Sequence, residues 1–103
     1  MISRYKGPIN YEPLDRDLIL DCLRQANVES VGLSNIPTVM KEIIRRSGLP
    51  NCIGAVHEML YDLDREGVIE LQPEAGLNRL SKEDLQICPP GPQGSKLTWA
   101  RFR

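Results

Sequence analysis

Apolar side chains recur every three or four residues in the first half of the chain, which is the period of an amphipathic helix. A first helix is predicted from about Pro13 to Gln25, with a stripe formed by Leu14, Leu18, Ile19, Cys22, Leu23 and Ala26. A second is predicted to start after Ser34 or Asn35, since either side chain can cap it, and to end at Gly48. Its stripe is Ile36, Val39, Met40, Ile43 and Ile44.

The third helical pattern follows a short turn, and Asn51 is its expected N-cap. Its apolar stripe is Ile53, Val56, Met59, Leu60 and Leu63. Gly67 follows the stripe directly and precedes a β-branched pair. We therefore expect Gly67 to end the helix in the left-handed backbone conformation, which glycine adopts at little cost.

Two later segments have the composition or alternation of β-strands. Val68–Leu71 is β-branched and precedes Pro73, and Lys96–Phe102 alternates between apolar and polar residues. We expect the two to pair antiparallel and to close a small sheet against the helices. Trp99 and Phe102 should lie on opposite faces of their strand, one in the core and one partly exposed. The connector at 27–35 is compatible with a further, very short strand near Val31 and Leu33.

The segment between these strands is long for a hairpin connection. Ser81 begins a capping box, which predicts one helical turn after it. Cys88–Gly94 contains three prolines and two glycines, so neither helix nor paired strand is expected there. Residues 1–12 show no period and are expected to form an extended N-terminal arm. The predicted fold is α+β: three helices followed by a β-hairpin with a long decorated wing, in one domain over 13–103.

Composition narrows the classes of function. The 103 residues carry a net charge of −1, so any nucleic-acid binding must depend on local clusters of bases. No apolar run approaches the roughly 18 residues of a membrane span, and no signal peptide is apparent, so a cytoplasmic protein is expected. Three widely separated cysteines and one histidine do not form a metal-binding pattern. No catalytic constellation, phosphate loop or cofactor motif is found, so an enzyme is not expected.

One run of residues suggests a family. Val56-x3-Leu60-x2-Leu63-x3-Gly67-Val68-Ile69 resembles the end of the recognition helix and the start of the wing in winged helix-turn-helix domains of the bacterial regulator type. The resemblance implies a small protein that binds double-stranded DNA, regulates transcription or assists another DNA transaction, and pairs as a homodimer. In such domains the helix after the turn enters the major groove.

Carried onto this sequence, the resemblance implies a set of DNA-binding residues. Asn51, His57 and Tyr61 lie on the third helix or at its start and are expected to reach base edges or a phosphate. Bases on the second helix and the last strand are expected to contact phosphates: Lys41, Arg45, Arg46, Lys96 and Arg101.

The charge of the third helix supports an alternative. From Asn51 to Leu71 there are five acidic residues and one base, Arg65. Carboxylates near phosphates are repulsive. The alternative is a winged-helix module that binds protein within a larger assembly, through the acidic third helix or the wing. A continuous positive face joining Arg45, Arg46, Lys96 and Arg101 would favour DNA, whereas scattered bases would favour protein.

Overall fold

The computed structural model describes residues 11–29, 33–73 and 81–103. At residues 28 and 29 it describes the backbone only. Within these residues the fold is α+β, as predicted, with four α-helices, one 3₁₀ turn and a three-stranded sheet. The elements in chain order are α1 (Arg16–Glu29), β1 (Ser34–Asn35), α2 (Ile36–Ser47), α3 (Ile53–Arg65), β2 (Ile69–Pro73), α4 (Lys82–Ile87), the 3₁₀ turn η1 (Pro92–Gly94) and β3 (Leu97–Phe102).

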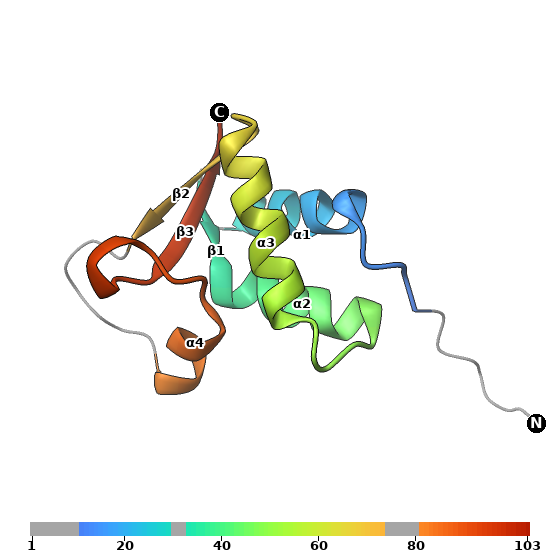
Figure 1. Ribbon diagram of the computed structural model, residues 1–103. Coiled ribbons are helices and arrows are strands. Elements are labelled where there is room, and N and C mark those ends of the chain that lie inside the picture. The colour runs from blue at the N-terminus through green and yellow to red at the C-terminus, as the bar shows by residue number, and fades with distance from the viewer. Residues whose placement is uncertain (1–10, 30–32, 74–80) are drawn as a thin grey trace, which may run out of the picture.

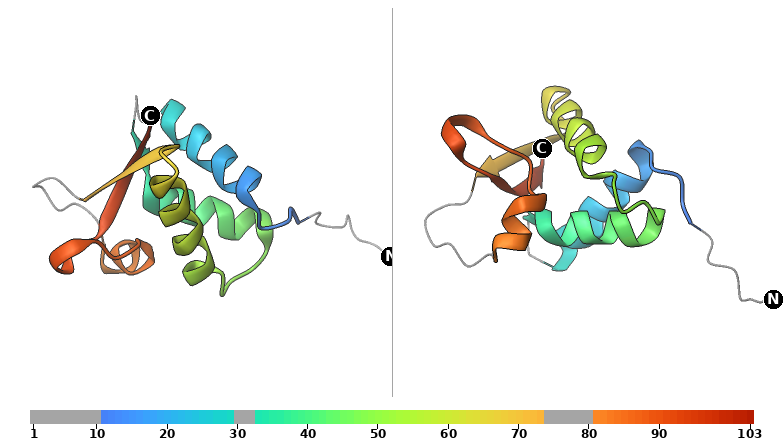
Figure 2. Two further views of the ribbon diagram at one scale, coloured as in Figure 1. Left: turned by 45° about the horizontal axis from the view of Figure 1, so that its top comes forward. Right: turned by 60° about the horizontal axis from the view of Figure 1, so that its bottom comes forward.

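The three longer helices pack together on one side of the small sheet (Figure 1). The strand order is β1-β3-β2, and β3 is antiparallel to both neighbours. The expected pairing of the two late strands is therefore confirmed. In the views of Figure 2, α4 lies at the end of the sheet and beside α2. This places part of the connection between β2 and β3 beside the predicted helix-turn-helix.

The core lies where the three helices meet the sheet. Its fully buried members include Ile19, Leu23, Met40, Leu60 and Ile69. In the second half of β3, Ala100 is buried and Phe102, half-buried, packs against the core, while Trp99, also half-buried, belongs to the opposite face. Leu97 and Thr98 are both buried, so the predicted alternation does not hold at the start of the strand, where the pairing with β2 is irregular.

Both glycine stops are confirmed. Gly48 has φ of 71° and donates its N–H to the carbonyl of Ile44, and Gly67 has φ of 79°. A side chain at Gly67 would meet open space, whereas a Cβ at Gly48 would come within 2.5 Å of the Tyr11 ring. The left-handed backbone therefore favours glycine at both positions, and the nearby Tyr11 ring favours it further at Gly48.

Two helix starts differ from the prediction. Helix α1 begins at Arg16 rather than Pro13, because the Asp15 carboxylate accepts the Leu18 N–H at 3.0 Å and caps the helix there. The assignment of Asn51 as the N-cap of α3 is wrong. Asn51 lies in the preceding turn, and the N-cap residue is Cys52, which has no side-chain cap bond.

Two predicted caps are confirmed, whereas the first strand and the proline-rich segment differ from the prediction. Asn35 caps α2 through the Thr38 N–H, and Ser81 caps α4 through the N–H of Asp84. The short strand lies at Ser34–Asn35 rather than near Leu33, and Val31 falls outside the described residues. The proline- and glycine-rich segment does contain one 3₁₀ turn and one bridge to Lys96, contrary to prediction. Positive φ angles at Gln93 and Gly94 allow that turn.

Candidate functional site

Helix α3 has three different surroundings around its circumference. Val56, Leu60 and Leu63 face the core. The opposite, exposed face begins with Gly54 and Ala55 and continues through Glu58, Asp62 and Arg65. The first turn of this face is therefore uncharged, and the remainder is predominantly acidic.

A third side of α3 contacts the end of α4 and the segment that follows it. The Nε2 of His57 lies 2.7 Å from the carbonyl oxygen of Ile87, and the Tyr61 hydroxyl donates to the carbonyl of Pro90 at 2.7 Å. A carbonyl only accepts, so Nε2 carries the proton in this geometry. Burial raises the pKa of Tyr61. The base contacts expected of His57 and Tyr61 would require both of these bonds to break.

The bases predicted to contact phosphates lie beside carboxylates. Lys41 contacts Asp84 at 2.9 Å, across the interface between α2 and α4. The other pairs are Arg45 with Glu42 at 2.5 Å, Arg46 with Glu12 and with Asp21 at 2.7 Å each, and Arg101 with Glu70 at 2.8 Å. Among the described residues, Lys96 has no such ion pair.

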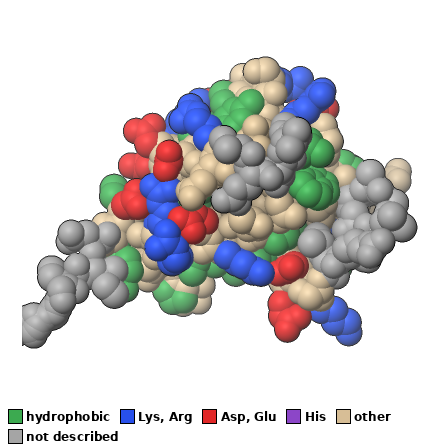
Figure 3. Space-filling view, turned by 180° about the vertical axis from the view of Figure 1, so that it is seen from behind, with side chains coloured by type: hydrophobic (Ala, Val, Ile, Leu, Met, Phe, Trp, Pro, Cys, Tyr) green, Lys and Arg blue, Asp and Glu red, His purple; other side chains and the backbone are tan. Residues whose placement is uncertain are grey.

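The pKa values of three paired acids are shifted by these contacts. Hydrogen bonds from the paired arginines lower the pKa of Glu12, Glu42 and Glu70 below the ordinary value. On the face drawn in Figure 3, blue basic and red acidic side chains lie next to each other, and no single blue surface extends across it. Four of the five predicted bases therefore each lie beside a carboxylate.

Arg46 is the most enclosed of these bases. Its side chain is only 16% exposed, and both of its terminal nitrogens and Nε donate to carboxylates of Glu12 and Asp21. The main chain joins the contact, because the Glu12 N–H donates to the Arg46 carbonyl at 2.9 Å. The last two residues of the predicted arm, Tyr11 and Glu12, therefore pack on the domain.

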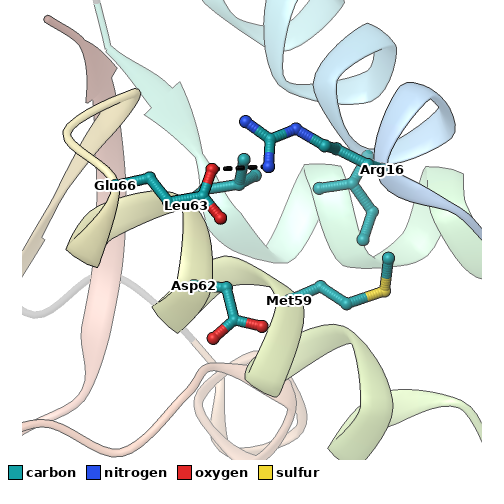
Figure 4. A pocket seen from close by; sticks show the side chains of 6 residues that line it. Arg16, Met59, Asp62, Leu63 and Glu66 are labelled. Carbon is teal, nitrogen blue, oxygen red and sulfur yellow. Dashed lines mark ion pairs between the residues drawn. The ribbon is translucent and has the colours of Figure 1, made fainter.

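A small cavity opens between α1 and α3. Its volume is about 100 Å³, and its lining consists of Arg16, Ile19, Met59, Asp62, Leu63 and Glu66. In Figure 4 the Met59 side chain extends from α3 toward α1, and the Arg16 guanidinium reaches the Glu66 carboxylate at 2.5 Å. Sequence patterns did not single out this place, because Arg16 and Glu66 are brought together only by the packing of two helices.

Within the described ranges, no three His, Cys, Asp or Glu side chains lie together as metal ligands would. None of the helices described here is both long enough and apolar enough to cross a bilayer. Comparison with protein-family models, with curated proteins and with solved structures finds no match to this chain.

Proposed function

We propose that this chain is a winged-helix-like module that binds another protein through the exposed face of α3. The fold is compatible with that assignment, since three helices are followed by an antiparallel pair of strands. Winged-helix domains serve many functions, so the fold by itself does not choose between partners. The distribution of charge is what separates protein from DNA.

The observation that carries the proposal is the pairing of bases with acids. Four of the five bases expected to contact phosphates have a carboxylate within 2.9 Å. DNA affinity depends on bases that replace counterions around the phosphates. A base with an adjacent carboxylate contributes little net charge to that exchange, because the carboxylate repels the same phosphate.

The exposed pairs are individually weak and can be broken. Arg45 is 70% exposed, so water screens its attraction to Glu42. Arg45 can therefore turn toward a ligand, but Glu42 remains one helical turn away and still opposes an anion. On α3 itself, Glu58 and Asp62 occupy the exposed face that a groove-docked helix turns toward DNA. A protein surface carrying bases meets no such repulsion.

Duplex DNA is the second candidate, with transcription regulation or another DNA transaction as its context. Two observations favour it. The first turn of α3 exposes Gly54 and Ala55 without an acid, and Asn51 before it is exposed. Lys96 has no carboxylate partner in the described part of the chain. A homodimer would be needed for useful specificity, because one domain of this size contacts few base pairs.

A titration against mixed-sequence duplex DNA at about 50 mM salt distinguishes the candidates, since non-specific binders register there. We expect no saturable binding by the wild-type protein. The double variant Glu58→Gln, Asp62→Asn removes two acids from the exposed face of α3. It should raise whatever weak affinity for duplex DNA the protein has. Glu83→Gln, an exposed acid on α4, is the matched control and should change it little.

Saturable binding by the wild type would favour the second candidate. Arg45→Ala with Lys41→Ala should then weaken binding for all sequences and flatten its salt dependence, because phosphate contacts set the salt slope. Asn51→Ala should instead alter sequence preference. A protein that binds duplex DNA in this pattern would contradict the proposal.

A further inference from the structure

The groove between α1 and α3 has an apolar floor. Ile19 and Leu63 are buried beneath it, and Met59 is half-buried at its side. Its volume of about 100 Å³ equals roughly three water molecules in the liquid, which is also enough for one branched aliphatic side chain. Figure 4 shows polar ends of Arg16 and Glu66 beside this apolar surface. The groove therefore offers one apolar position with charged groups next to it.

Acidic side chains follow one another along α3 and its C-cap: Asp62 and Glu66 line the groove, and Glu58 lies one turn before Asp62. Glu58, Asp62 and Glu66 are spaced by four residues, so they follow one another along the same side of the helix, and all three are exposed. Like charges at this spacing destabilise a helix. Asp62 is offset by Arg65 and Glu66 by Arg16, whereas Glu58 has no ion partner among the described residues. Glu66 therefore helps to join the end of α3 to α1, whereas Glu58 adds no ion pair to the fold within the described residues.

We infer that the groove binds a basic amphipathic helix of a partner protein. The inference rests on the proposed function and names the chemistry of its partner. One aliphatic side chain of that helix enters the cavity over Met59 and Leu63. A lysine or arginine side chain about one turn from it contacts Glu58, whose carboxylate has no ion pair among the described residues. An acidic helix is excluded, because its carboxylates would lie next to the acidic side chains of α3 and be repelled by them.

Defined peptides test the inference without knowledge of the natural partner. The probe is a leucine–lysine peptide of about 18 residues, long enough to form a helix, with its leucines on one face. The controls are a scrambled peptide of the same composition and a version with glutamate in place of lysine. Binding is followed by the amide resonances of the isotope-labelled protein. We expect the amide resonances of Ile19, Met59 and Leu63 to shift saturably with the amphipathic basic peptide and not with either control peptide.

Variants then locate the contact. Glu58→Gln should weaken the peptide about two- to fivefold, the range of one exposed ion pair. Met59→Ala should weaken it further, because the apolar contact is lost. Glu83→Gln is the matched control and should leave the affinity unchanged. Dispersed amide resonances in each variant show that it is folded, so a loss of affinity is not a loss of structure.

Absence of shifts at the groove with about 1 mM peptide, or equal binding of the scrambled peptide, overturns the inference. That outcome leaves the proposed function standing if α3 contacts a protein elsewhere on its exposed face. Saturable binding of duplex DNA through α3 would instead remove both.

Discussion

The packing of α3 leads to a stability prediction for Leu60→Ala. Leu60 is fully buried at the middle of α3, within the core that joins the helices to the sheet. Removing a buried leucine side chain costs its transfer from water plus a cavity term, about 2–5 kcal/mol in total. The whole free energy of unfolding of a domain this size is about 5–15 kcal/mol. The substitution should therefore remove a large fraction of the stability.

Urea unfolding followed by circular dichroism gives the size of the loss. A loss of about 3 kcal/mol lowers the midpoint by about 1–3 M urea at ordinary m-values, with the slope unchanged. Leu49→Ala is the matched control, since Leu49 is 46% exposed, and should change stability by about 0.5 kcal/mol or less. Equal losses in the two variants would show that the core is not where this account places it.

Three further predictions concern backbone, pH and thiol chemistry. Gly67→Val should lower the thermal midpoint more than Gly67→Asn, because φ is +79° and asparagine tolerates it better; equal midpoints would contradict this. The hydrogen bond from Arg46 lowers the pKa of Glu12 from 4.5, so this pair stabilises the fold above pH 4.5 and is lost as the pH falls through the lowered pKa. Glu12→Gln should therefore lower stability at pH 7 and weaken its acid dependence, and an unchanged pH profile would refute the role of this pair. Burial raises the pKa of Cys22 to about 11, so alkylation at pH 8, followed by mass spectrometry, should be slow until urea unfolds the protein.

The helices and their stops were predictable because their signals are local. The spacing of apolar residues placed α2 and α3, and Gly48 and Gly67 ended them where a left-handed residue was required. The start of α3 was not predictable in the same way. Asn51 has the side chain of a good cap, but the chain enters the helix one residue later, through a turn that includes Pro50.

The surroundings of the candidate site depend on contacts between distant parts of the chain. His57 and Tyr61 bond to backbone carbonyls about thirty positions away, and every residue has a carbonyl, so no residue type marks these partners. The partner of Arg46 at Glu12 is 34 positions away and lies in a segment without periodicity. The acidity of the third helix was visible in the sequence. The neutralisation of the bases elsewhere was not, because it depends on which charges the fold brings together.

The central claim is that the exposed face of α3 contacts a protein. A photo-crosslinking amino acid at position 58, in cells that make this chain, tests it most directly, with the same group at position 83 on α4 as control. We predict crosslinked species from position 58 that protease removes and nuclease does not, with far less from position 83. Adducts at position 58 that nuclease removes would contradict the claim and establish nucleic acid as the ligand of this face.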